Sequence, residues 1–143
     1  MTRRRDDGST LPLILVFLAI AAGFVVVTAG ATALHLERLR LLTVADGAAL
    51  AAAESFSVDD ADVQGATVVP RLSDAAVEAA AAAAVDGADA AGLVDLRLVE
   101  ARTPDGRTAF VRLAATWHPP IAGPLLPVAL PVTVVSTAAA RFR

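Results

Sequence analysis

Cysteine and lysine are both missing from this sequence of 143 residues. Without thiols the chain can form no disulfide, no thiolate metal site and no thiol redox centre, so a domain outside the cytoplasm must be held together by packing alone. All twelve basic residues are arginine, a bias that we attribute to GC-rich coding and not to mechanism. The net charge of -3 is small and the arginines are scattered, which argues against a nucleic-acid partner.

Motifs for catalysis and cofactor binding are missing as well. The two histidines, His35 and His118, are far apart in the sequence and lack the HExxH spacing of a metal site. A solvated or backbone-bonded imidazole is the ordinary interpretation of each. The sequence has no GxSxG elbow, glycine-rich phosphate loop or Cys/His pair. We therefore expect no enzymatic activity, no cofactor, no metal ion and no small-molecule substrate.

A long apolar run is the strongest feature that is present. The 24 residues from Leu11 to Leu34 carry no charge, and a helix of that length rises about 36 Å, enough to cross a hydrocarbon core of about 30 Å. The mean hydropathy of the whole chain, +0.62, is too high for an ordinary soluble protein of this size. Pro12 suits the first turn of such a helix. The run therefore predicts a transmembrane helix, with the lipid bilayer as its partner.

Arginines on both sides of the run bear on its orientation. Arg3, Arg4 and Arg5 precede the run and favour a cytoplasmic N-terminus. Arg38 and Arg40 follow it and weaken the asymmetry. We expect a single-pass protein of the cell membrane with its N-terminus in the cytoplasm.

The predicted organisation has three parts. A cytoplasmic basic tip (1–10) is followed by the transmembrane helix (11–34) and by an extracytoplasmic α+β domain (35–143). A cleaved secretory signal is the alternative, because Ala29-Gly30-Ala31 fits a small-x-small cleavage site. The apolar run is longer than the apolar core of an ordinary signal peptide, which favours the anchor.

Helical spacing continues beyond the apolar run. Apolar residues recur at Leu36, Leu39, Leu42, Ala45, Ala49, Ala52 and Phe56. One helix is therefore expected from about Leu11 to Ser55, with an amphipathic second half that packs against the outer domain. Small residues would let another helix approach closely, and the candidate packing positions are Gly23, Gly30, Gly47, Ala48, Ala49 and Ala52.

The rest of the chain mixes loop, helix and strand signals. Residues 57–72 are predicted to form a loop with one short strand at 66–69. Within it Asp59, Asp60 and Asp62 are either a solvated acidic loop or calcium ligands, and the missing EF-hand glycine and distal glutamate favour the former.

A second helix and three strands are predicted after this loop. Ser73 caps an alanine-rich helix from Asp74 to about Val85. A strand with Val94, Leu96 and Leu98 on one face then joins a strand at 109–117 through turn chemistry at 103–107. A last strand begins at Val132. The predicted class is α+β, with an antiparallel sheet and the second helix packed on the long helix.

A proline-rich stretch, 118–131, separates the last two predicted strands. Its prolines lack the donors that a strand ladder needs. Apolar residues beside and within it either cover the end of the sheet or form a docking loop for a partner, and these candidates are Trp117, Ile121, Leu125, Leu126, Val128 and Leu130.

Several motifs resemble those of one known family. These are the basic tip, Asp7-Gly8-Ser9 before the apolar helix, ADGAALAAA at 45–53, ATWHPP at 115–120 and the terminal TVVSTAAARFR. Together they resemble the TadE/TadG-like proteins of tight-adherence (Flp) pilus systems, in particular the short actinobacterial type. The resemblance implies a pilin-like fold and a role as minor pilin or pilus assembly component. It also implies helix contacts with other pilin-like membrane proteins.

The sequence departs from the pattern of that superfamily at one position. Prepilin processing uses a glycine followed five residues later by glutamate, whereas Gly8 is followed at that offset by Leu13. An uncleaved, membrane-anchored assembly factor therefore fits better than a processed pilin. The rival hypothesis is a generic anchored or secreted binding module of the cell envelope. It would bind a cell-wall or protein ligand through the proline-rich or acidic loop.

Overall fold

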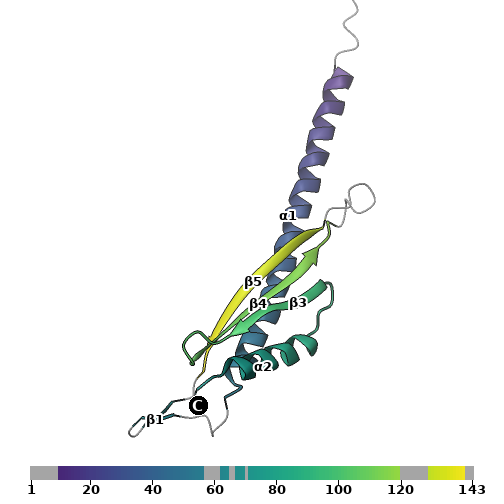
Figure 1. Ribbon diagram of the computed structural model, residues 1–143. Coiled ribbons are helices and arrows are strands. Elements are labelled where there is room, and N and C mark those ends of the chain that lie inside the picture. The colour runs from purple at the N-terminus through teal and green to yellow at the C-terminus, as the bar shows by residue number, and fades with distance from the viewer. Residues whose placement is uncertain (1–9, 57–61, 65–66, 70, 120–128, 141–143) are drawn as a thin grey trace, which may run out of the picture.

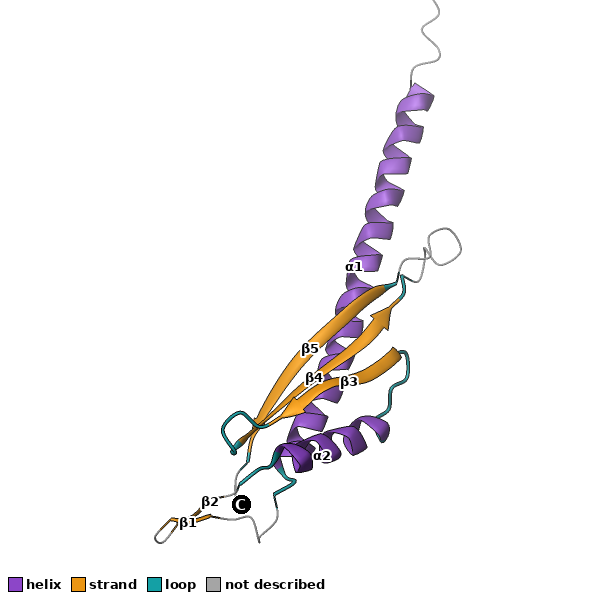
Figure 2. Cartoon of the chain, viewed as in Figure 1, coloured by secondary structure: helices purple, strands orange, loops and turns teal. Residues whose placement is uncertain are grey.

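A computed structural model describes residues 10–56, 62–64, 67–69, 71–119 and 129–140. The elements are, in chain order, α1 (Thr10–Ala53), β1 (Asp62–Gln64), β2 (Thr67–Val69), α2 (Asp74–Asp86), β3 (Val94–Arg102), β4 (Thr108–Trp117) and β5 (Leu130–Ala139). The last three strands form an antiparallel sheet in the order β3-β4-β5, and β1 pairs with β2 in a separate hairpin. The predicted α+β class is confirmed, with the sheet and α2 beside the second half of α1 (Figure 2).

α1 is one uninterrupted helix of 44 residues, about 66 Å long at 1.5 Å per residue. It begins at Thr10, so Pro12 falls in the first turn, where a missing N–H costs no hydrogen bond. The first half of the helix stands clear of the domain and the second half runs along the sheet (Figure 1). The single helix predicted from Leu11 to Ser55 is confirmed to within two residues at each end.

The face that α1 turns toward the domain differs from the predicted one. Its buried residues are Leu41, Ala45, Ala48, Ala49, Ala52 and Ala53. Leu36 and Leu39, predicted to lie on this face, are 52% and 46% exposed, so those two assignments were wrong. At about 100° per residue Leu39 points roughly 160° away from Leu41. The contact line is mostly alanine, which lets the sheet lie close to the helix backbone.

β4 is the central strand and supplies much of the core. Its alternate residues Ala109, Val111, Leu113 and Ala115 are at most 2% exposed and belong to one cluster with the buried face of α1. The hairpin of β3 and β4 predicted around the turn at 103–107 is confirmed. This cluster also contains Val77 of α2, so helix, sheet and α2 share a single core.

β5 begins two residues earlier than predicted. Leu130 and Pro131 already pair with Trp117 and Thr116, although Pro131 was expected to end the proline-rich stretch outside the sheet. β5 lies at the sheet edge, where a strand needs hydrogen bonds on only one side, and an edge strand tolerates proline.

β3 is irregular at its start. The register with β4 shifts between Val94 and Arg97, and Asp95 has a φ of 52°, a left-handed conformation that aspartate tolerates better than most residues. Leu96 and Leu98 pack against the core as predicted, but Val94 is 45% exposed. The predicted common face for Val94, Leu96 and Leu98 was therefore wrong at Val94, because the irregularity interrupts the alternation.

The segment before α2 contains more strand than expected. The predicted strand at 66–69 is present as β2, and its partner β1 was not predicted. Asp62 is the first residue of β1. Asp59 and Asp60 lie outside the described residues.

Polar side chains fix the ends of the elements to one another. The Ser73 hydroxyl accepts a hydrogen bond from the Ala76 amide at 3.3 Å, which confirms the predicted cap of α2. Asp74 accepts from the Thr103 amide at 2.7 Å and so ties α2 to the β3–β4 turn. Ser136 of β5 donates to Asp46 of α1 at 2.5 Å. This last bond joins the sheet directly to α1.

The β3–β4 turn is organised by the carboxylate of Asp105. Its Oδ1 accepts from the amides of Arg107 (2.9 Å) and Thr108 (2.6 Å), and its Oδ2 accepts from the Thr108 hydroxyl at 2.9 Å. The hydrogen bond from the Arg107 backbone amide is the largest cause, followed by those from Thr108, and together they lower the pKa of Asp105 below its ordinary 3.8. These bonds favour the ionised carboxylate, and protonation weakens them.

Replacing this aspartate is therefore expected to change the pH dependence of stability. A carboxyl group with a lowered pKa in the folded state stabilises the fold above its unfolded-state pKa. That stabilisation is lost as the pH falls through the lowered value. The stability difference between wild type and Asp105→Asn should be largest above pH 3.8 and should shrink in more acidic solution. Thermal unfolding of both proteins in detergent over an acid pH series measures this difference, and a constant difference at all pH values would contradict the assignment.

Candidate functional site

The first half of α1 is an apolar surface that the described chain leaves unpartnered. Its most apolar 18-residue window has a mean hydropathy of 2.7, and no residue in the window is buried by the protein. The helix is thus long and apolar enough to span a membrane. Thr28 donates its hydroxyl to the Phe24 carbonyl at 2.8 Å, and Thr32 donates to the Thr28 carbonyl at 2.9 Å. Both hydroxyl groups are therefore satisfied within the helix, as a lipid environment requires.

The predicted helix-packing positions divide into two groups. Gly23, Gly30 and Gly47 have open space where a Cβ would lie, with no described atom within 4 Å apart from the adjacent residues and backbone of α1 itself. Ala48, Ala49 and Ala52 are at most 1% exposed. These three alanines are therefore occupied by the core of their own domain. Close packing of another helix at Gly23 and Gly30 stays a prediction.

The other predicted site residues fall at different places. Trp117 ends β4, is 8% exposed and lies at the end of the sheet, next to α1. Leu130 begins β5 and is 43% exposed. The remaining predicted members of the docking loop and of the basic tip lie outside the described residues: Arg3, Arg4, Arg5, Ile121, Leu125, Leu126 and Val128.

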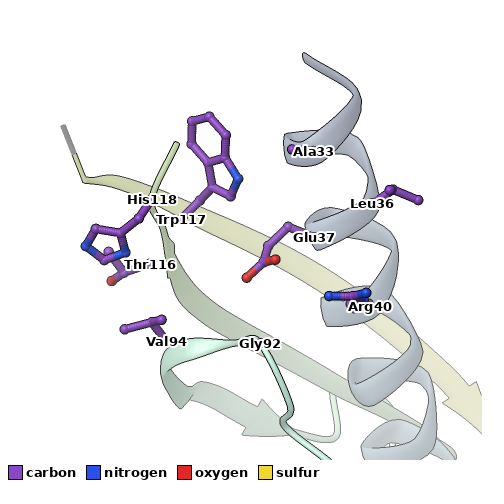
Figure 3. Close-up of a pocket in the computed structure, with 9 residues that line it drawn as sticks. All are labelled: Ala33, Leu36, Glu37, Arg40, Gly92, Val94, Thr116, Trp117 and His118. Carbon is purple, nitrogen blue, oxygen red and sulfur yellow. The ribbon is translucent and has the colours of Figure 1, made fainter. Parts of the chain in front are cut away.

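A pocket that sequence reasoning missed lies between α1 and the end of β4. It has a volume of about 270 Å³ and is lined by Ala33, Leu36, Glu37, Arg40, Gly92, Val94, Thr116, Trp117 and His118 (Figure 3). Figure 3 shows the carboxylate of Glu37 in the space between α1 and the end of β4. The sequence shows Glu37 and Arg40 three residues apart on one helix face, but only the tertiary fold brings Thr116 and Trp117 opposite them.

Gly92 lines this pocket, and two features of its position disfavour any residue with a Cβ. Its φ is +89°, which favours glycine, and a Cβ at this position would lie 3.1 Å from Nη1 of Arg40. The Arg40 guanidinium is thus close to the backbone at Gly92. Within the described part of the chain neither Glu37 nor Arg40 takes part in an ion pair.

Gly92→Ala is expected to lower the free energy of unfolding by about 1 to 2 kcal/mol, the usual cost of a left-handed conformation for a residue with a Cβ. Gly87→Ala is the matched control, because Gly87 has a φ of -87° and its added Cβ would meet only the Ala83 carbonyl at 3.4 Å. Denaturant unfolding followed by circular dichroism compares the two variants. Equal stabilities would show that the conformation of Gly92 is not required.

A charged cluster covers the sheet face opposite the core. Glu100 pairs with Arg102 at 2.6 Å and with Arg112 at 3.2 Å. The guanidinium groups of these arginines lie 4.7 Å and 5.5 Å from the centre of the Phe110 ring. Both arginines are therefore engaged, and such half-exposed pairs contribute at most about 1 kcal/mol each. The cluster stabilises the sheet surface and leaves neither cation unpaired.

The histidines are both exposed and belong to different elements, His35 to α1 and His118 to the residues after β4. Over residues 10–56, 62–64, 67–69, 71–119 and 129–140, no group of three His, Asp or Glu side chains is placed to hold a metal ion. The features of this chain that bear on function are therefore the bare helix and the pocket at its junction with the sheet.

No family model, curated protein or solved structure matches the chain. The resemblance to TadE/TadG-like proteins accordingly rests on the sequence motifs.

Proposed function

We propose that this chain is a non-catalytic, single-pass membrane protein that acts as a minor-pilin-like or assembly component of a Tad/Flp-type pilus or a related secretion apparatus. One observation supports the proposal above the others. The same 44-residue helix is an exposed apolar rod in its first half and the central core element of an α+β domain in its second half.

The physical argument concerns what such a helix can do. Its bare half is too long and too apolar to be left in water, so a bilayer or other helices must cover it. Because the domain is built on the same helix, any contact that the bare half makes is transmitted to the domain without a flexible joint. A subunit of this form can be held in a bilayer and can also pack laterally against similar helices.

Exposed leucines extend the contact surface beyond the apolar run. Leu36, Leu39 and Leu50 are 52%, 46% and 55% exposed. Their side chains lie outside the domain core and could provide lateral apolar contacts beyond the membrane. Gly23 and Gly30, which have open space around them, are the places in the run where a neighbouring helix could approach most closely.

The intact mass of the mature protein from native membranes tests this proposal. A full-length chain, with or without Met1, that resists alkaline extraction is the expected result. Loss of residues 1–8 would identify a processed pilin, and loss through about Ala31 would identify a secreted module and overturn the proposal.

A genetic experiment tests the assembly role separately. Deleting the gene in the native host is expected to remove surface pili, and the full-length gene should restore them. Unchanged pilus yield after deletion would contradict a role in assembly, whatever the state of the N-terminus.

A further inference from the structure

The pocket between α1 and β4 lies at the depth of the lipid headgroups if α1 spans the bilayer as proposed above. Ala33, at one side of the pocket, is still within the apolar run, whereas Arg40 lies six residues beyond Leu34, about 9 Å further along the axis. The headgroup layer on each side of a bilayer is roughly 5 to 8 Å thick. The polar part of the pocket therefore opens within or directly above that layer.

A second hollow places the end of the sheet at the same level. It is lined by Leu34 and Arg38 of α1 and by Leu130, Pro131 and neighbouring residues of β5. The membrane-proximal ends of β4 and β5 thus both lie beside the end of the apolar run. Trp117 is at this end of the sheet, and tryptophan is enriched at membrane interfaces.

An apolar groove leads from the bare helix into the pocket. It runs along α1 past Phe24, Val25, Thr28, Ala29 and Thr32 to Ala33 and Leu36. Ala33 and Leu36 also line the polar pocket. The two sites therefore adjoin, with an apolar strip on one side of α1 at hydrocarbon depth and charged groups at headgroup depth. This division matches the two ends of a phospholipid.

The charges in the pocket select the class of headgroup. Glu37 and Arg40 place one negative and one positive side chain on the same wall, and neither is neutralised by an ion pair within the described residues. Thr116 and Trp117, at the end of β4, line the opposite wall. A ligand that carries both a phosphate and an ammonium group would satisfy both charges, whereas a purely anionic headgroup would face the carboxylate of Glu37.

We propose that this pocket binds a zwitterionic phospholipid of the surrounding leaflet, with its phosphate on Arg40, its ammonium group on Glu37 and an acyl chain in the groove. The proposal rests on the membrane anchoring of α1 and adds a defined lipid site to it. Such a lipid would fix the height of the domain above the bilayer, because its headgroup would bridge α1 and the end of β4.

Native mass spectrometry of the full-length chain tests the site. The protein in detergent is mixed with equimolar phosphatidylethanolamine, phosphatidylcholine and phosphatidylglycerol, and the retained lipid is identified. The two zwitterionic lipids are expected to dominate the adducts of wild type. Arg40→Gln should reduce their retention about tenfold, as expected for loss of a charge-assisted contact. Glu37→Gln should shift the preference toward phosphatidylglycerol.

Matched variants control for charge itself. Arg97→Gln and Glu78→Gln remove one exposed charge each from β3 and α2, away from the pocket, and should retain lipids as wild type does. Equal retention of all three lipids by wild type, a wild-type preference for phosphatidylglycerol, or an equal effect of Arg97→Gln and Arg40→Gln would overturn the proposal.

Trp117 provides a second readout that does not depend on a variant, because it is the chain's one tryptophan. In proteoliposomes its fluorescence should be quenched more strongly by a lipid spin-labelled on the headgroup than by one labelled near the end of its acyl chain. Stronger quenching by the deep label, or none by either, would overturn the placement. Alkaline extraction of the same proteoliposomes separates the two proposals: a protein that is extracted has no anchor, whereas a retained protein without lipid selectivity lacks only this site.

Discussion

The double substitution Ala22→Arg and Val26→Arg is expected to remove the chain from the membrane fraction. Both residues are exposed in the middle of the apolar run and lie on one face of α1, four positions apart. An arginine at the centre of a spanning helix costs about 2.5 to 3.5 kcal/mol, so the pair costs roughly 5 to 7 kcal/mol. Alkaline extraction of membranes, followed by immunoblotting of pellet and supernatant, measures the result.

The control places the same charges on the same helix outside the span. Leu39 and Leu50 are 46% and 55% exposed and lie beyond the apolar run. Leu39→Arg with Leu50→Arg should leave the protein in the membrane pellet. A wild-type distribution for the Ala22→Arg, Val26→Arg protein would mean that the apolar run does not cross the bilayer.

Leu113→Ala is expected to lower the free energy of unfolding of the domain by about 2 to 5 kcal/mol. Leu113 lies in the middle of the central strand, is 0% exposed and packs in the core that includes the alanine face of α1. Truncation removes transfer free energy and leaves a cavity that this rigid, alanine-lined interface cannot fill by rearrangement. Denaturant unfolding in detergent, followed by Trp117 fluorescence, gives the difference.

Val135→Ala is the matched control for that truncation. Val135 belongs to the same sheet but is 45% exposed on the face away from the core. Its truncation should cost less than about 1 kcal/mol, as surface substitutions usually do. If both variants lose the same stability, the core is not where α1 meets β4.

Features with strong local signals were predictable from the sequence. The apolar run, the helical spacing beyond it, the Ser73 cap and the turn at 103–107 each predicted an element that is present in the structure. Each of these signals is contained in a few adjacent residues, so no knowledge of the tertiary contacts was needed.

The errors occurred where tertiary context overrides a local pattern. Leu36 and Leu39 continued an apolar spacing, but the domain packs on the face of α1 that begins at Leu41. Pro131 was expected to interrupt a strand, but an edge strand accommodates it. The exposed position of Val94 follows from the conformation at Asp95, which the alternation of residues did not predict.

The candidate site could be predicted only in part. The bare helix follows directly from the absence of charge over 11–34. The pocket does not, because Gly92 and Trp117 come from segments far from Arg40 in the sequence and are brought together by the packing of the sheet on α1. No spacing rule within one element contains that information.

Cysteine labelling tests the central claim most directly, since the chain has no native cysteine. Single variants Thr2→Cys, Val25→Cys and Glu54→Cys would be treated in intact spheroplasts with a membrane-impermeant maleimide, before and after permeabilisation. If α1 spans the membrane with its N-terminus in the cytoplasm, Glu54→Cys reacts in intact spheroplasts, Thr2→Cys reacts only after permeabilisation, and Val25→Cys reacts in neither state. Reaction of Val25→Cys as fast as Glu54→Cys, or of Thr2→Cys before permeabilisation, would contradict the account.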